Sequence, residues 1–121
     1  MALILVVDDE PDACSMLCRI LSAMGHEVVT FNAANAALEW LNGQVPQLAV
    51  LDYRLPDLDG IQLLTLVRKR YPDVKVLMLT AYPSAEVAGE AMALGASAFL
   101  LKPIEIEELE AGVEKSLRLS A

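Results

Sequence analysis

The sequence predicts an α/β protein of the (βα)5 type, with a doubly wound, five-stranded parallel sheet. Two observations indicate this fold class: five short apolar runs alternate with five amphipathic stretches, and the connections between them are short. Strands that alternate with helices in this way are joined by right-handed crossovers and form a parallel sheet. Five strands are too few for an eight-stranded barrel, so we expect an open sheet with helices on both faces.

The five apolar runs lack polar alternation, which is typical of parallel strands buried on both faces. The first run has no leading Lys or Arg and is shorter than the apolar centre of a signal peptide, so it is interpreted as a strand. The expected strands cover residues 3–7, 28–31, 48–51, 74–79 and 96–101.

Between these runs, apolar residues recur every three or four positions, which predicts amphipathic helices. Pro in a first turn, Ser as an N-cap and Gly after the last turn mark their ends. The expected helices begin at or near Pro11, Ala34, Ile61, Ser84 and Ile106, and the first four end at Gly25, Asn42-Gly43, Pro72 and Gly95.

Length and composition limit the possible functions. The chain has 121 residues and a net charge of −8, so we expect one domain over residues 1–121 that does not bind nucleic acid directly. The mean hydropathy of +0.44 argues against disorder, and no apolar stretch approaches the roughly 20 residues of a membrane span. Cys14 and Cys18 are interpreted as small hydrophobic residues in a reducing cytosol, and the expected location is cytoplasmic.

Polar residues that follow the strands predict the functional site, because open α/β sheets bind ligands outside the carboxyl ends of their strands. The pair Phe31-Asn32, which ends the second strand, offers less chemistry than the others. The residues expected at the other strand ends are Asp8-Asp9, Asp52, Thr80 and Lys102-Pro103.

Three carboxylates at one sheet edge repel one another, so the cluster requires positive charge nearby. Mg2+ prefers such oxygen ligands and is often shared with phosphate oxygens, and Lys102 would supply a second positive charge. Such a site suits a phosphoryl group, which a neighbouring carboxylate can accept as an acyl phosphate. Any one acidic residue could simply cap a helix, and it is the joint arrangement that indicates a site.

Four sequence blocks resemble the receiver domains of bacterial two-component response regulators. They are residues 5–11 (LVVDDEP), 50–60 (VLDYRLPDLDG), 78–81 (MLTA) and 99–103 (FLLKP). The blocks occur in the order and spacing of that family, and the resemblance covers essentially the whole chain. It implies a flavodoxin-like fold, similar to the chemotaxis receiver, with strand order 2-1-3-4-5.

The resemblance also implies a role for each site residue. Asp52 would accept a phosphoryl group from a sensor histidine kinase or phosphotransfer protein. Asp9, Asp52 and the carbonyl of Arg54 would bind Mg2+, with Asp8 helping through water. Lys102, Thr80 and the N–H of Ala81 would hold phosphoryl oxygens, and Phe99 would change rotamer when Thr80 moves. Arg54 and Tyr82 would flank the approach of hydrolytic water, and the Lys102–Pro103 bond would be cis.

Signalling would pass through the fourth helix, fifth strand and fifth helix to an output domain or partner protein. A phosphorylation-dependent homodimer is also expected, without membrane attachment. The domain would phosphorylate and dephosphorylate only itself and turn over no external substrate. The sequence leaves open whether an output domain follows residue 121.

Three other functions are weaker. A small aspartyl-phosphate phosphatase or phosphotransferase of the haloacid-dehalogenase kind needs a carboxylate two residues after the nucleophile, where this chain has Arg54. A flavin or nucleotide carrier needs a phosphate-binding loop where Asp8-Asp9-Glu10 stands. A non-phosphorylated, receiver-like dimerisation module would not require the full set of Asp9, Asp52, Thr80 and Lys102.

Overall fold

The computed structural model of the chain describes residues 1–81 and 84–118. Strands and helices alternate along these residues, as the sequence predicts. The elements are β1 (Leu3–Val7), α1 (Pro11–Ala23), β2 (Glu27–Phe31), α2 (Ala34–Leu41), β3 (Leu48–Asp52), α3 (Gly60–Arg70), β4 (Lys75–Thr80), α4 (Ala85–Ala93), β5 (Ala98–Leu101) and α5 (Ile106–Arg118).

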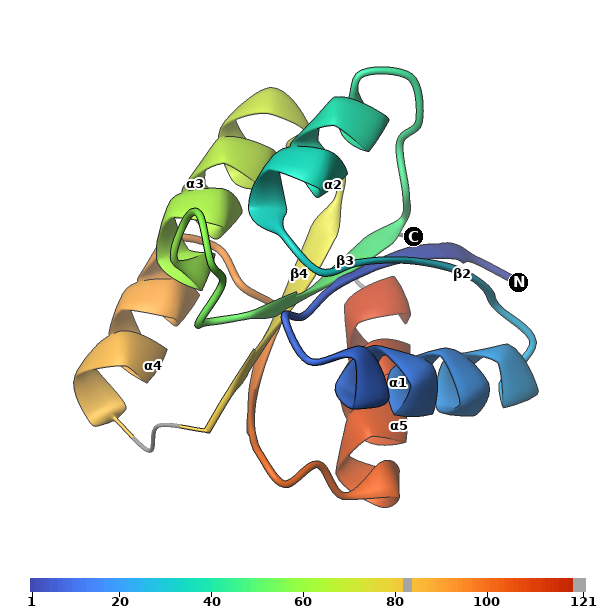
Figure 1. Ribbon diagram of the computed structural model, residues 1–121. Coiled ribbons are helices and arrows are strands. Elements are labelled where there is room, and N and C mark those ends of the chain that lie inside the picture. The colour runs from blue at the N-terminus through green and yellow to red at the C-terminus, as the bar shows by residue number, and fades with distance from the viewer. Residues whose placement is uncertain (82–83, 119–121) are drawn as a thin grey trace.

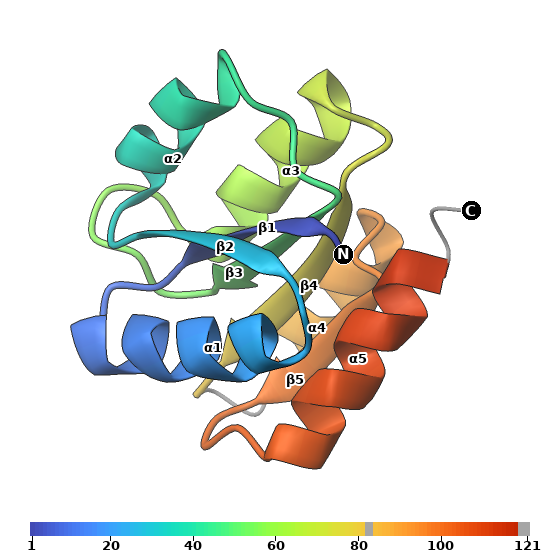
Figure 2. The same ribbon diagram turned by 90° about the vertical axis from the view of Figure 1, so that its right-hand side faces the viewer.

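The strands form one sheet in the order β2-β1-β3-β4-β5, and every neighbouring pair is parallel. The predicted fold class and strand order are therefore confirmed. Figures 1 and 2 show helices on both sides of the sheet, with α2 and α3 on one side and α1 and α5 on the other. Helix α4 packs on the α2 and α3 side, where its buried Ala91 joins the same core cluster.

The core consists of two apolar layers separated by the sheet. Val7 and Leu51 face α2 and α3, whereas their neighbours Val6 and Val50 face α1 and α5. Successive side chains of a strand point to opposite faces, so the central strands are buried on both sides. This explains why β1 and β3 show almost no polar residues.

The two edge strands differ from the sequence prediction. No residue of β2 is fully buried, because β2 has only one neighbouring strand and its helices cover it incompletely. Strand β5 begins at Ala98 rather than at residue 96, since the Ala96 N–H is bonded instead to the Ala91 carbonyl at the end of α4. Burial on both faces therefore belongs to the central strands and not to the edges.

Helix ends follow the local signals in the sequence. The Ser84 hydroxyl accepts a hydrogen bond from the Val87 N–H, which confirms Ser84 as the N-cap of α4. Gly25 and Gly95 follow α1 and α4 with φ of 93° and 102°, a backbone region that favours glycine. Among the described residues, no helix has both the length and the apolar character needed to cross a membrane.

Candidate functional site

The predicted polar residues lie together at the carboxyl edge of the sheet. Asp8 follows β1, Asp52 ends β3, Thr80 ends β4 and Lys102 follows β5. Asp8, Asp52 and Thr80 are buried despite their polarity. Because the strands are parallel and in register, their carboxyl ends bring residues that are distant in sequence to one place.

Lys102 is the electrostatic centre of this cluster. Its Nζ lies 2.7 Å from Asp8 Oδ2, 3.4 Å from Asp52 Oδ2 and 3.7 Å from Glu10 Oε1. The peptide bond that follows it, Lys102–Pro103, is cis, as expected. The lysine stem starts from an edge of the sheet and reaches the carboxylates of two inner strands, so β5 and the loop after it hold the ammonium in place.

The pKa values reflect an excess of negative charge. Burial, followed by the charge of Asp8, raises the pKa of Asp52 to about 6, and Lys102 only partly offsets this. Burial alone would lower the pKa of Lys102, but its hydrogen bond to Asp8 and the charges of Asp52 and Asp8 leave that pKa raised. Lys102 is therefore charged at neutral pH. The carboxylates still carry more negative charge than Lys102 neutralises, so the site attracts a further cation.

The carboxylates fit a hard divalent cation. One oxygen from each of Asp8, Asp9 and Glu10 lies within 4.8 Å of the others, and Asp9 and Glu10 are exposed to incoming ions. Carboxylate oxygens are the ligands that Mg2+ takes, together with water. The sequence reasoning did not assign Glu10 a role, although its position directly after Asp8-Asp9 was a visible signal.

Thr80 and Phe99 lie on the same face of the sheet. Met78 pairs with Phe99 and Thr80 pairs with Leu101, so side chains two residues apart on these strands point to one side. Phe99 is partly buried against the core on the side of α4. Ala81 follows Thr80 at the surface, and Tyr82 lies outside the described residues. The register thus places the two expected switch residues on the side of the sheet that α4 covers.

The loop from β3 to α3 is held close to Asp52. The Tyr53 N–H donates to the Leu79 carbonyl at 2.8 Å, and Gly60 donates to the Tyr53 carbonyl at 2.6 Å. A Cβ at Gly60 would lie 2.5 Å from the Asp52 carbonyl oxygen, so only glycine fits there without displacing the backbone. The backbone of the exposed Arg54 forms an isolated antiparallel β-bridge with the backbone of Asp59 across the loop.

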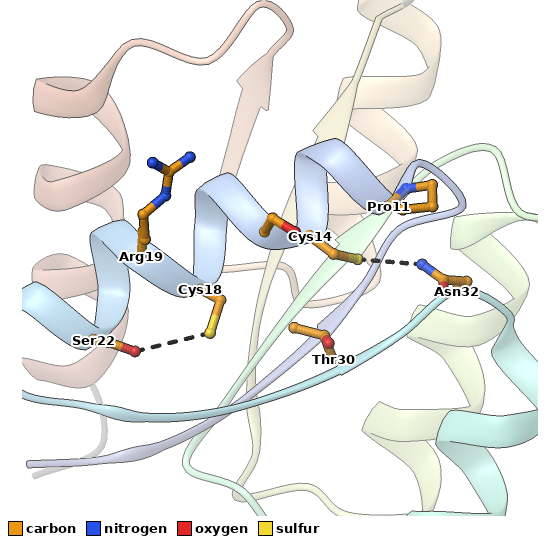
Figure 3. Close-up of a pocket in the computed structure, with 8 residues that line it drawn as sticks. Pro11, Cys14, Cys18, Arg19, Ser22, Thr30 and Asn32 are labelled. Carbon is orange, nitrogen blue, oxygen red and sulfur yellow. Dashed lines mark hydrogen bonds between the residues drawn. The ribbon is translucent and has the colours of Figure 1, made fainter.

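Asn32 is closer to the site than the sequence suggested. Its Nδ2 donates to the Asp8 carbonyl at 2.9 Å and lies 3.5 Å from Cys14 Sγ. Figure 3 shows this contact at one end of a cleft of about 630 Å³ between α1 and β2, in which Cys18 also lies. The cysteines are free thiols, and burial raises the pKa of Cys14. Asn32, which the sequence predicted to offer less chemistry than the other strand ends, therefore supports the backbone of Asp8.

A comparison with known protein families identifies the family to which this chain belongs. The model of the response regulator receiver domain family matches residues 4–114, which is most of the chain and includes every residue of the cluster. The chain belongs to that family. It is therefore a receiver domain of two-component response regulators, and the sequence-based identification is confirmed.

Known relatives agree with this assignment. The receiver domain is 40% identical over 114 residues to the transcriptional regulatory protein ZraR of Escherichia coli (strain K12), covering 94% of this chain and 26% of ZraR. It thus spans about a quarter of the length of such curated relatives.

Solved structures show the same fold. A CheY-like receiver domain from Methanospirillum hungatei JF-1 superposes with a TM-score of 0.93 and 30% identity, covering 99% of this chain and 96% of that one. The beryllofluoride-activated NtrC4 receiver domain dimer superposes with a TM-score of 0.94 and 28% identity, covering 98% of both chains.

Proposed function

We propose that this receiver domain accepts a phosphoryl group on Asp52 from a sensor histidine kinase or phosphotransfer protein. The observation that carries the proposal is the contact of the Lys102 ammonium with both Asp8 and Asp52 at the sheet edge of a receiver-family chain. One cation placed between two buried carboxylates is a ready partner for the oxygens of an incoming phosphoryl group.

In the proposed transfer, an oxygen of Asp52 attacks the phosphorus atom while the bond from phosphorus to the donor imidazole nitrogen breaks. The electron pair of that bond leaves with the imidazole, and Asp52 becomes an acyl phosphate. Lys102 exchanges part of its contact with Asp52 for a phosphoryl oxygen. The Thr80 hydroxyl and the Ala81 N–H, at the end of β4, would hold the other oxygens.

The donor set for Mg2+ would be Asp9, Asp52 and the Arg54 carbonyl, with Asp8 acting through water and Glu10 beside them. When bound, Mg2+ neutralises charge on the phosphoryl oxygens and on the surrounding carboxylates. The pKa of Asp52, raised to about 6, supports a need for Mg2+, because it shows that the negative charge of the carboxylates exceeds the positive charge that Lys102 supplies.

The proposed output is a change in the face formed by α4, β5 and α5. Thr80 and Phe99 lie on the α4 side of the sheet, so a movement of Thr80 toward the phosphoryl group would be felt there. Its recipients would be an output domain, a partner protein or a second copy of the chain. The domain would catalyse only its own phosphorylation and dephosphorylation.

Intact-mass spectrometry with acetyl phosphate and Mg2+ tests the proposal. The protein should gain one phosphoryl group, and Asp52→Asn should gain none. Asp9→Ala should reduce both Mg2+ binding and labelling, whereas excess chelator should prevent labelling of the native chain. Unchanged labelling of Asp52→Asn would refute the assignment. A chain that dimerises without ever being labelled would instead support a non-phosphorylated dimerisation module.

A further inference from the structure

Helix α2 begins without a capping side chain of its own. Its N-cap is Ala33, and its first turn contains no acidic residue. The cap comes instead from Asp57 in the loop from β3 to α3. Asp57 Oδ1 accepts the Ala34 N–H at 2.9 Å and Oδ2 accepts the Asn35 N–H at 2.7 Å. In both ribbon views this loop runs beside the start of α2 (Figures 1 and 2).

Asp57 also lies at the tip of the loop that carries a proposed metal ligand. The loop starts after Asp52, includes Arg54, and is closed at its base by the Gly60–Tyr53 hydrogen bond. The Leu58 N–H, at 3.1 Å, is a third donor to Asp57. A carboxylate that accepts backbone donors at a helix N-terminus forms strong, charge-assisted bonds. The loop is thus fixed at its base by β3 and at its tip by α2.

The start of α2 is fixed on its other side to the loop after β1. Asn32, which precedes the helix by two residues, donates to the Asp8 carbonyl (Figure 3 shows its side chain beside Cys14). The Asp8 N–H donates to the Phe31 carbonyl at 3.0 Å. The N-terminus of α2 therefore connects the segment bearing Asp8 and Asp9 to the loop bearing Arg54.

We propose that Asp57 is a positioning residue of the metal and phosphoryl site. Through the N-terminus of α2 it keeps the Arg54 loop at a fixed separation from Asp8 and Asp9, although it touches no reacting atom. The part concerning Mg2+ rests on the proposed function. The physical reason is preorganisation: a loop that is already ordered loses less conformational entropy when its carbonyl binds a cation.

The test must separate positioning from simple helix capping. Asp57→Ala removes both functions, whereas adding Ala33→Ser to it restores a local cap, because Ala33 already has the extended backbone of an N-cap. The readouts are the free energy of unfolding in urea, the amide exchange of residues 53–59 without Mg2+, and the Mg2+ dissociation constant from NMR titration.

We expect Asp57→Ala to destabilise the fold, accelerate exchange in residues 53–59 and weaken Mg2+ binding about three- to tenfold, somewhat less than the loss usual for direct partners of metal ligands. The double variant should regain stability but keep the fast exchange and the weak Mg2+ binding. Recovery of all three properties would overturn the proposal, as would unchanged Mg2+ affinity and loop exchange in Asp57→Ala.

Tyr71→Phe is the matched control. It removes the hydrogen bond from the Tyr71 hydroxyl to the Leu41 carbonyl, at the opposite end of α2, and should lower stability without changing Mg2+ affinity. If the native chain shows no Mg2+-dependent shifts, the proposed function fails. The exchange of residues 53–59 in the double variant then still decides whether Asp57 positions the loop.

Discussion

Asp52 is a carboxylate whose ionised form is disfavoured by its own fold. Its pKa of about 6, against an ordinary 3.8, means that the folded state binds more protons than the unfolded state between these values. The stability that this group contributes is present below about pH 4 and is lost as the pH rises through 6. The site therefore carries an electrostatic cost at neutral pH when no metal is bound.

Asp52→Asn should consequently stabilise the metal-free protein at pH 7 by about 1–3 kcal/mol, because one buried charge is removed. The advantage should shrink as the pH falls toward 4. Urea unfolding between pH 4 and 7 measures the difference in the free energy of unfolding between Asp52→Asn and the native chain. Asp73→Asn is the control, because it removes one carboxylate charge at an exposed position. A variant no more stable than the native chain at pH 7 would contradict this account of Asp52.

Arg54 is exposed and stands two residues after Asp52, a position that the family resemblance predicts to flank the approach of hydrolytic water. A charge-assisted bond from Arg54 to a phosphoryl oxygen would stabilise the phosphorylated state, and about 1.4 kcal/mol corresponds to tenfold in rate. We expect Arg54→Ala to lose its phosphoryl group up to about tenfold faster after donor removal. Arg70→Ala is the control. Unchanged or slower loss of the phosphoryl group in Arg54→Ala would show that the Arg54 side chain does not protect the Asp52 phosphate from hydrolysis.

At the scale of a single element, two glycines in helices should respond in opposite ways to the same change. A Cβ at Gly60, the first residue of α3, would meet the Asp52 carbonyl oxygen at 2.5 Å, whereas nothing lies within 4 Å of a Cβ at Gly89 in α4. Gly60→Ala should therefore destabilise the fold by about 1–3 kcal/mol and slow phosphorylation. Gly89→Ala should stabilise it by roughly 0.5–1 kcal/mol.

Thermal or urea unfolding, together with the rate of labelling by acetyl phosphate, measures both effects. Equal stability changes in the two variants would show that the close approach of α3 to Asp52 is not maintained in solution.

For the whole molecule, exposed apolar side chains at the ends of α4 and β5 predict that phosphorylation changes assembly through the face formed by α4, β5 and α5. Leu101 at the end of β5 is 46% exposed, and Met92 and Leu94 at the end of α4 are 46% and 37% exposed. We expect beryllofluoride with Mg2+ to promote a homodimer through this face and to reduce amide exchange there. Analytical ultracentrifugation measures the fraction of dimer in the native chain and in Leu101→Glu, which should remain monomeric. Protection confined to α1 and α2 would contradict this choice of face.

The sequence by itself determined the order of elements, the parallel sheet and the set of residues at its carboxyl edge. It could do so because apolar periodicity and residues such as Ser84, Gly25 and Gly95 act over a few positions. The convergence of Asp8, Asp52 and Lys102 follows from the same pattern, because parallel strands bring their carboxyl ends together. The roles of these residues in phosphoryl transfer remain predictions.

Only the tertiary structure decided which contacts support the site. Asn32 holds the Asp8 carbonyl, and Asp57 caps a helix that begins 23 residues earlier in the chain. It also showed that β2 is an incompletely covered edge strand. A hydrogen bond between two loops depends on how the helices pack on the sheet, and no local pattern of residues encodes that distance.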